Sequence, residues 1–290
     1  MCSSDLAGVP YWGSDIGGYK CLTDAPHDKE MLVRWYEMSA LSPMMHEEDA
    51  CSNPVGGERV KARLWDDVET QDIYRDVAGL HTRLAPYFRA LARRANLNGA
   101  PITRAPVLLF PSLPEAWKVD DAFFVGPSLY AAPVVRRGVR ERRVWLPPGR
   151  YVEWTQGSVH EGPGFVVVPA PLGRLPMFVV ENQLVPLLDA EVQTLARATE
   201  PGVVTEASRA DVLDVVAALG PGGFASMTLA DGTSVEVRRG AKTNATCAAC
   251  SVEMFGAVKR VRLSDVTTFD DVTVSSTGTK QIRWQVLELP

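Results

Sequence analysis

Hydrophobic residues recur every three or four positions in two segments of the first hundred residues, a pattern that predicts two helices. In residues 28–42 the recurring positions are Met31, Trp35, Met38 and Leu41. Pro43 should end this helix. A longer segment with the same spacing runs from about residue 69 to Asn98, and Gly99 should close it. Pro86 falls inside that segment and is expected to kink or split it.

After Gly99 the pattern changes to short apolar runs separated by Pro and Gly. Such a pattern is typical of an antiparallel β-sandwich. The sequence LPPG at 146–149 predicts a turn between two strands. A second β-rich unit is expected from about residue 190, with Asp231 and Gly232 as the turn of a hairpin.

The composition is that of an ordinary globular protein and excludes several partner classes. The 290 residues carry a net charge of −5, with 46% hydrophobic and 22% charged residues. This charge gives no basic field for nucleic acid, and no apolar run is long enough for a membrane span. The densest basic stretch, RRGVRERR at 136–143, predicts a solvated hairpin tip, with an anion site as the alternative.

The cysteines indicate neither a disulfide framework nor a metal site. There are five, an odd number, and only Cys247 and Cys250 have the CxxC spacing. No second pair or nearby histidine completes a zinc set, so two free thiols or one local disulfide is the favoured interpretation. We expect no metal and no cofactor.

The stretch GVPYWGSDIGGY at 8–19 carries the first candidate chemistry. Val9, Tyr11 and Trp12 are expected to end a buried strand, with Asp15 in the glycine-rich loop beyond it. An aromatic ring beside a carboxylate suits sugar recognition, because rings stack on pyranose faces and carboxylates accept hydroxyl protons. The alternative is that Asp15 only caps a helix or turn.

Several stretches in order resemble glycoside hydrolase family 31, the α-glucosidase and α-xylosidase group. They are GVPYWGSDIGGY, EMLVRWYEMSALSPMM, LHTRLAPYFRALA, and the run from FFVGPSLYAAPVV to VPAPLGRLPMFVVENQLVPLL. The resemblance covers roughly residues 7–188. It implies an α/β plus all-β chain in three parts. Residues 1–99 would be the C-terminal end of a (β/α)8 TIM barrel, 100–189 a proximal β-sandwich, and 190–290 a second, smaller β domain.

The resemblance implies a retaining glycosidase acting on an α-linked oligosaccharide or glycoside. Such an enzyme needs a carboxylate nucleophile and a second carboxyl as acid and base. In the family both precede the loop that contains Asp15, and neither motif is found in this sequence. The chain is therefore expected to be part of a longer enzyme, inactive alone and without a catalytic residue of its own. The alternative is a non-catalytic carbohydrate-binding or structural β-sandwich module.

The residues carried over from the family are three substrate-binding candidates, Trp12, Asp15 and His46. After the next helix the family has Pro, two apolar residues, Arg, any residue and His, the Arg and His lining the pocket. Here the sequence is PMMHEE at 43–48, so His46 stands where Arg is expected and Glu48 where His is. Either His46 takes the family histidine's role, or the substrate is not a plain glucoside. A solvated loop histidine is the alternative for His46.

Overall fold

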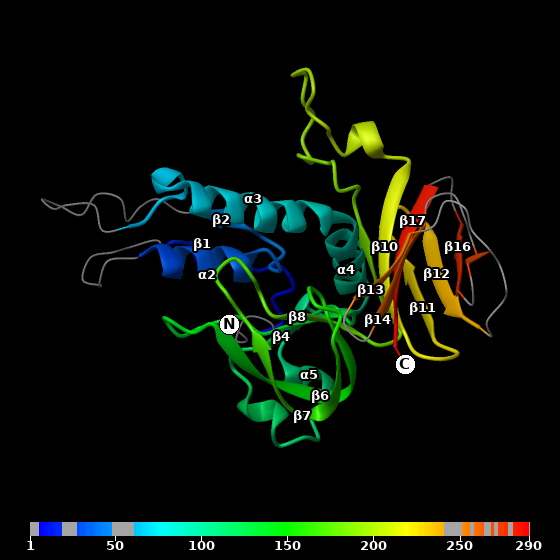
Figure 1. Cartoon of the computed structure of the whole chain (residues 1–290), viewed down its shortest axis with the longest axis horizontal. Helices are drawn as coiled ribbons and strands as arrows, with labels where there is room; N and C mark the ends of the chain where they lie inside the picture. Colours follow the sequence, from blue (N-terminus) through cyan, green and yellow to red (C-terminus); the bar gives the residue numbers. More distant parts are fainter. Residues whose placement is uncertain are drawn as a thin grey trace, which may run out of the picture.

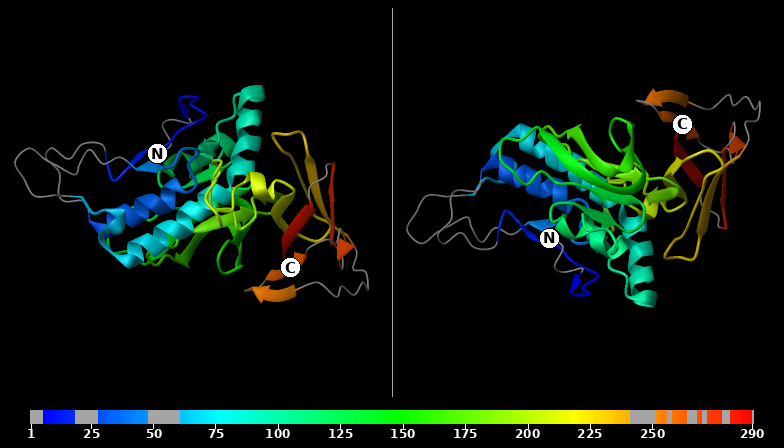
Figure 2. Two further views of the ribbon diagram at one scale, coloured as in Figure 1. Left: turned by 90° about the horizontal axis from the view of Figure 1, so that it is seen from above. Right: turned by 90° about the horizontal axis from the view of Figure 1, so that it is seen from below.

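A computed structural model describes residues 6–18, 28–47 and 61–240, and strands and short segments between 251 and 289. The predictions for Glu48, Cys247 and Cys250 lie outside the described residues. In Figure 1 the helices α2 (Lys29–Ser39) and α3 (Val68–Arg83) lie side by side with two short strands next to them, one β-sheet lies below, and the strands from residue 183 onward are gathered at the other end of the molecule. The views in Figure 2 show the same separation of the first helices from the C-terminal strands.

The first element is a β-α-β unit. The short strands β1 (Asp15–Ile16) and β2 (His46–Glu47) pair in parallel, and α2 (Lys29–Ser39) connects them. A parallel pair needs such a crossover connection because its strands run in the same direction. The helix begins where the Asp28 side chain accepts a hydrogen bond from the Met31 N–H, at 2.9 Å.

The predicted apolar face of this helix was wrong in part. Met31 is 43% exposed, whereas Leu32, Val33 and Tyr36 are fully buried. The buried face is wider than the three-to-four spacing indicated, because α2 is covered on two sides. One side packs against α3 (Val68–Arg83), and the other contacts the segments around residues 139 and 170–173.

The contact on that second side is a buried ion pair. Arg34 and Glu37 are 7% and 1% exposed, and their side chains meet at 2.9 Å. The Arg34 guanidinium also donates to the carbonyls of Val139, Ala170 and Pro171, at 2.7–3.1 Å. Glu37 accepts the Gly173 N–H at 2.7 Å. The pair therefore fastens the helix between β1 and β2 to segments more than a hundred residues away.

The long predicted helix is split at its proline, as expected. It forms α3 and α4 (Ala85–Asn98), with Leu84 between them and Pro86 in the first turn of α4. A proline there costs no hydrogen bond, because the first N–H groups of a helix have no intrahelical partner. Gly99 ends α4 in the left-handed conformation, with φ of 73°.

Residues 103–180 form a six-stranded antiparallel sheet in the order β3-β4-β5-β8-β6-β7. Its strands are β3 (Thr103–Arg104), β4 (Phe123–Val125), β5 (Leu129–Ala131), β6 (Glu141–Glu153), β7 (Val159–Pro169) and β8 (Met177–Val180). The short elements η2 (Leu64–Asp66), α5 (Pro106–Leu109), η3 (Ala116–Lys118) and η4 (Ala207–Arg209) lie outside the sheets.

The turn predicted at LPPG was wrong. Residues 146–149 lie inside the single strand β6, where the register with β7 shifts between Leu146 and Gly149. Prolines are tolerated at such irregularities because they need no ladder N–H there. Proline and glycine therefore mark a bulge here rather than a chain reversal.

The remaining strands form two further sheets. One has the order β13-β14-β17-β10-β9 and the other β11-β12-β16-β15. Their strands are β9 (Gln183–Leu187), β10 (Val212–Leu219), β11 (Phe224–Thr228), β12 (Ser234–Arg239), β13 (Ser251–Phe255), β14 (Val258–Leu263), β15 (Thr268–Phe269), β16 (Val272–Ser276) and β17 (Gln281–Glu288).

These two sheets share a hydrophobic core that includes Leu213, Val235, Val274 and Trp284. The hairpin predicted at Asp231 and Gly232 is confirmed by the antiparallel pairing of β11 with β12. Strand β9 precedes residue 189 yet pairs with β10. The opposite face of β9 and β10 packs against α4 and the six-stranded sheet. The boundaries at 99 and 189 stay predictions.

Asp67 gives the start of α3 a pH-dependent stability. Its carboxylate accepts hydrogen bonds from Lys29, at 2.6 Å, and from the Thr70 N–H, at 3.0 Å. The Lys29 ammonium, followed by Thr70, lowers the pKa of Asp67 from 3.8 to about 2. A lowered pKa stabilises the fold above the unfolded-state value, and this contribution disappears as the pH falls from about 4 through 2.

As the pH falls through this window, we expect the free energy of unfolding to decrease less in the Asp67→Asn variant than in the unsubstituted chain. The asparagine oxygen still caps the helix but does not titrate. Urea unfolding at pH 5, 4, 3 and 2 measures the difference. Parallel pH dependences in the two proteins would show that Asp67 contributes nothing through its charge.

Candidate substrate-binding site

Asp15 and His46 lie side by side at the parallel pair β1–β2. They are register partners, and the His46 Nε2 and Asp15 Oδ1 atoms are 2.8 Å apart. The His46 side chain is 45% exposed and the Asp15 side chain is 43% exposed. Residues far apart in the sequence thus form one accessible polar pair, because in-register neighbours on parallel strands project to the same face.

The residues that follow them in each strand point the other way. Ile16 is buried against Leu32, Tyr36 and Val77. Glu47 accepts a hydrogen bond from the Tyr36 hydroxyl at 2.6 Å, and the buried Lys61 ammonium lies 3.6 Å from its other oxygen. This alternation fixes which of the two neighbouring acids, Asp15 or Glu47, is accessible.

Glu47, Tyr36 and Lys61 form a supporting layer that the sequence did not predict. Burial, followed by the hydrogen bond to Glu47, raises the pKa of Tyr36 well above its usual range. Tyr36 therefore stays a hydrogen-bond donor, and it holds the Glu47 carboxylate beneath the exposed pair. The only sequence signal was the adjacency of Glu47 to His46, which does not reveal where the carboxylate points.

Two glycines allow the loop to lie close to its neighbours. Gly17 has φ of 82°, and a Cβ there would lie 2.2 Å from Cε of Lys61. A Cβ on Gly13 would lie 2.4 Å from the Met44 carbonyl oxygen. Side chains at these positions would separate the Asp15 loop from the His46 strand.

Trp12 joins the candidate site through its backbone. Its carbonyl accepts the Met44 N–H at 3.4 Å, and its side chain is half-buried. The prediction that Val9, Tyr11 and Trp12 end a buried strand was wrong, since Val9 and Tyr11 are exposed and β1 begins at Asp15. A strand buried on both faces needs neighbouring strands, and in the described residues β1 pairs with β2 alone.

The exposed pair can bind neutral polar groups. Asp15 offers two carboxylate oxygens with about four lone-pair sites, of which His46 uses one. The carboxylate contact fixes the orientation of the imidazole ring, whose edge remains accessible. A substrate hydroxyl can therefore donate to Asp15 next to the ring.

His81, in α3, is a structural histidine. Its Nδ1 lies 3.1 Å from the Ala40 carbonyl oxygen, and burial lowers its pKa. Within the described part of the chain, no group of three or more His, Cys, Asp or Glu side chains is arranged to hold a metal ion. No helix in those same ranges is both long and apolar enough to cross a membrane.

Comparison with known proteins gives two family matches in chain order. Residues 1–91 match the glycosyl hydrolases family 31 TIM-barrel domain, and residues 99–185 match the glycosyl hydrolase family 31 C-terminal domain. A sulfoquinovosidase of Agrobacterium fabrum is 31% identical over 179 residues, covering 61% of this chain and 26% of that protein. Alpha-xylosidase 1 of Arabidopsis thaliana is 29% identical over 189 residues, 64% of this chain and 20% of that protein.

The fold of nearly the whole chain has a solved counterpart. A dextranase of Flavobacterium johnsoniae, complexed with glucose, matches with a TM-score of 0.64 over 98% of this chain and 33% of its own, at 21% identity. The chain spans 26% of the length of the sulfoquinovosidase and 20% of the length of the α-xylosidase. The paired family matches and these relatives show that the chain belongs to glycoside hydrolase family 31.

Proposed function

We propose that Asp15 and His46 form one wall of a glycoside-binding pocket in a retaining enzyme that cleaves α-linked glycosides. The observation that carries the proposal is their contact at 2.8 Å on the accessible face of the parallel pair β1–β2. Trp12 is the proposed apolar contribution from the same loop.

The same proposal assigns parts to the domains. Residues 1–99 would be the end of a (β/α)8 barrel, 100–189 a proximal β-sandwich, and 190–290 a distal β domain. The β1–α2–β2 unit supports the first assignment, because it repeats the strand-helix-strand order of a barrel.

We place the nucleophile and the acid/base carboxyl outside these 290 residues. A retaining glycosidase needs two carboxyls about 5–5.5 Å apart across the scissile bond. Near Asp15, the described carboxylate of Glu47 is engaged by Tyr36 and Lys61 beneath the site. It is therefore not available for attack on a sugar.

The alternative, a non-catalytic carbohydrate-binding β module, receives less support. It requires exposed aromatic rings across a sheet face. Among the aromatic residues on the strands of the six-stranded sheet, Phe165 alone is exposed, and Tyr130, Tyr151 and Phe178 are completely buried. A single exposed ring does not make a stacking platform across the sheet.

Titration of the 290-residue chain with p-nitrophenyl α-glucoside and α-xyloside tests the proposal. We expect weak binding, with a Kd on the order of 1 mM, and no release of p-nitrophenol. The matching β-glycosides serve as the control and should bind less well. Turnover above the blank would contradict the placement of the catalytic carboxylates, and equal binding of both anomers would contradict α-specificity.

A further inference from the structure

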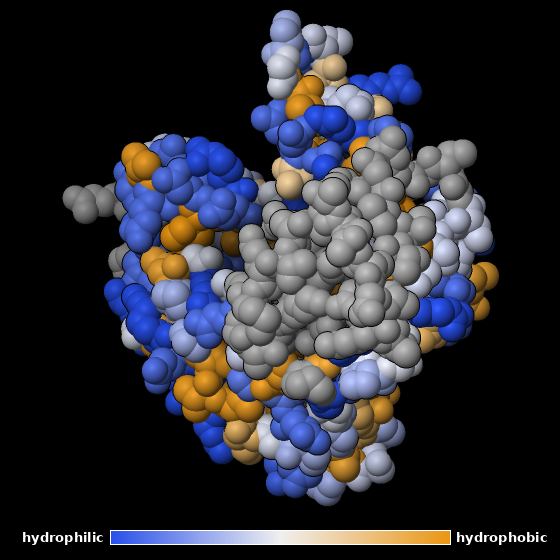
Figure 3. Space-filling model, turned by 45° about the vertical axis from the view of Figure 1, so that its right-hand side comes forward, coloured by the Kyte–Doolittle hydropathy of each residue, from blue (hydrophilic) through white to orange (hydrophobic). Residues whose placement is uncertain are grey.

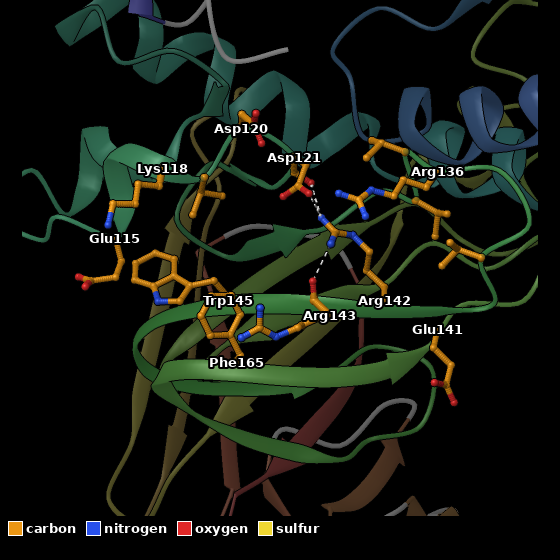
Figure 4. Close-up of a pocket in the computed structure, with 14 residues that line it drawn as sticks. Glu115, Lys118, Asp120, Asp121, Arg136, Glu141, Arg142, Arg143, Trp145 and Phe165 are labelled. Atoms are coloured by element: carbon orange, nitrogen blue, oxygen red, sulfur yellow. Dashed lines mark hydrogen bonds and ion pairs between the residues drawn. The ribbon is translucent and has the colours of Figure 1, made fainter.

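A cavity lies against strands β6 and β7 of the six-stranded sheet. It has a volume of about 620 Å³ and is formed by the segment 115–121, the loop 134–143 and strands β6 and β7. Its walls carry four cations, four carboxylates and two aromatic rings (Figure 4): Lys118, Arg136, Arg142 and Arg143; Glu115, Asp120, Asp121 and Glu141; and Trp145 and Phe165. Neither Asp15 nor His46 lines it, so it is a different site from the proposed glycoside pocket.

The basic stretch at 136–143 is largely exposed, as predicted, but it is not the tip of a hairpin, because it joins β5 to β6 and these strands do not pair with each other. Several of its arginines have structural partners. Arg137 and Arg140 form ion pairs at 2.5 Å with Asp28 and Glu30 at the start of α2. The Arg142 guanidinium is largely buried and pairs with Asp121 at 2.6 Å. These contacts anchor the loop and fix one wall of the cavity.

Arg142 has little capacity left for a ligand. Besides the Asp121 carboxylate, its guanidinium donates to the carbonyls of Pro133, Asp121 and Arg143, at 2.6–3.2 Å. Asp121 is neutralised by the same pair. The cavity therefore contains a satisfied ion pair at its back, and its remaining charge comes from other residues.

Arg136 and Arg143 supply that charge. Arg136 is exposed, has no ion pair or hydrogen-bond partner among the described residues, and points toward the Asp121–Arg142 pair in Figure 4. The Arg143 guanidinium carbon lies 3.5 Å from the ring centroid of Phe165 and forms no ion pair within the described part of the chain. Lys118 also lines the cavity, and the carboxylates of Glu115, Asp120 and Glu141 lie away from the Arg136 and Arg143 guanidiniums in Figure 4.

The opposite wall is apolar. Phe165 is 56% exposed although it lies on β7, and the edge of Trp145 lies beside it. Val135 is also exposed and lines the cavity. On the face drawn in Figure 3, hydrophobic patches lie among hydrophilic residues. The Arg143 guanidinium covers one face of Phe165, and a ligand ring can pack against the part of the ring that stays exposed.

We propose that this cavity binds a small molecule that carries an oxyanion, such as a phosphate, sulfate or carboxylate, on a ring. The oxyanion accepts hydrogen bonds from Arg136 and Arg143, whose planar donors match its geometry. The ring packs on Phe165 and Val135. This site goes beyond the proposed glycoside cleavage and does not depend on it.

Calorimetric titration of the 290-residue chain tests this proposal with phenyl phosphate, glucose 6-phosphate, inorganic phosphate and glucose as probes. We expect at least one ring phosphate to bind about threefold or more tightly than inorganic phosphate, because a ring contact adds to the charge. Added salt should weaken this binding. A preference for phenyl phosphate indicates an aromatic ring and a preference for glucose 6-phosphate a sugar ring, and both support the site.

Variants locate the binding. We expect Arg136→Gln to weaken binding of the preferred ring phosphate about tenfold. We expect Phe165→Ser to bind the ring phosphate no more tightly than inorganic phosphate. Arg197→Gln, an exposed arginine outside the cavity, is the matched control and should change nothing. Absence of ring-phosphate binding, equal loss in the Arg136 and Arg197 variants, or glucose binding as tightly as its phosphate would overturn the proposal.

Discussion

Replacing Arg34 with methionine is expected to lower the free energy of unfolding by about 3–5 kcal/mol, because it leaves a buried carboxylate without its partner. Glu37 is almost fully buried, and burial already raises its pKa despite the opposing Arg34 charge. The variant also removes the donors to three carbonyls that join α2 to the segments around 139 and 170. Urea unfolding of the full chain measures the loss.

The exposed pair Asp72–Arg75 is a matched control for this experiment. It has the same three-residue spacing on a helix and a contact of 2.5 Å, but its side chains are 60% and 70% exposed. Arg75→Met should therefore cost less than about 1 kcal/mol. In the double variant Arg34→Met/Glu37→Met the loss should be smaller than the sum of the single losses. Similar losses in the Arg34 and Arg75 variants would contradict the importance given to burial.

Replacing Asp15 with alanine is expected to weaken α-glycoside binding by about 10- to 100-fold, the range of hydrogen bonds to a charged group. The variant removes the acceptor for a sugar hydroxyl and also the group that orients His46. Because Asp15 is half exposed, the fold should tolerate the change. Calorimetry with p-nitrophenyl α-glucoside measures the affinity.

Two further variants separate a binding role from a general charge effect. Asp15→Asn keeps one acceptor oxygen and should retain more affinity than Asp15→Ala. Asp72→Ala removes an exposed carboxylate that lies on α3 and should leave the affinity unchanged. If Asp15→Ala bound the glycoside as well as the unsubstituted chain, Asp15 would be only a turn residue.

The elements that the sequence predicted correctly depend on neighbouring residues alone. Pro86 splits the long helix because it cannot donate within it, and Gly99 closes α4 by adopting a positive φ. Asp231 and Gly232 form the hairpin turn for equally local reasons. In each case a few consecutive residues are enough to determine the local backbone conformation.

The failures involve contacts between distant segments. The sequence LPPG lies within β6 rather than at a turn, because β7 pairs on both sides of it. The buried face of α2 extends to Arg34 and Glu37 because a loop from the six-stranded sheet covers it. Periodicity along one helix contains no information about that second partner.

In the candidate site, too, the sequence identified individual residues but not the contacts between them. Asp15 and His46 were identified separately from family motifs, and their contact follows from the parallel register of β1 and β2. That Glu47 faces Tyr36 and Lys61 while His46 faces Asp15 depends on strand alternation, which two-residue strands do not reveal in the sequence. Their assignment to sugar binding remains a prediction.

The most direct test of the central claim is the imidazole NMR signal of His46 in the 290-residue chain during titration with an α-glycoside. We predict that the His46 signal shifts in a saturable manner with the same Kd as the calorimetric binding, and that Asp15→Ala abolishes the shift. A His46 signal that stays unchanged while the glycoside binds would contradict the account, because the sugar would then occupy another surface.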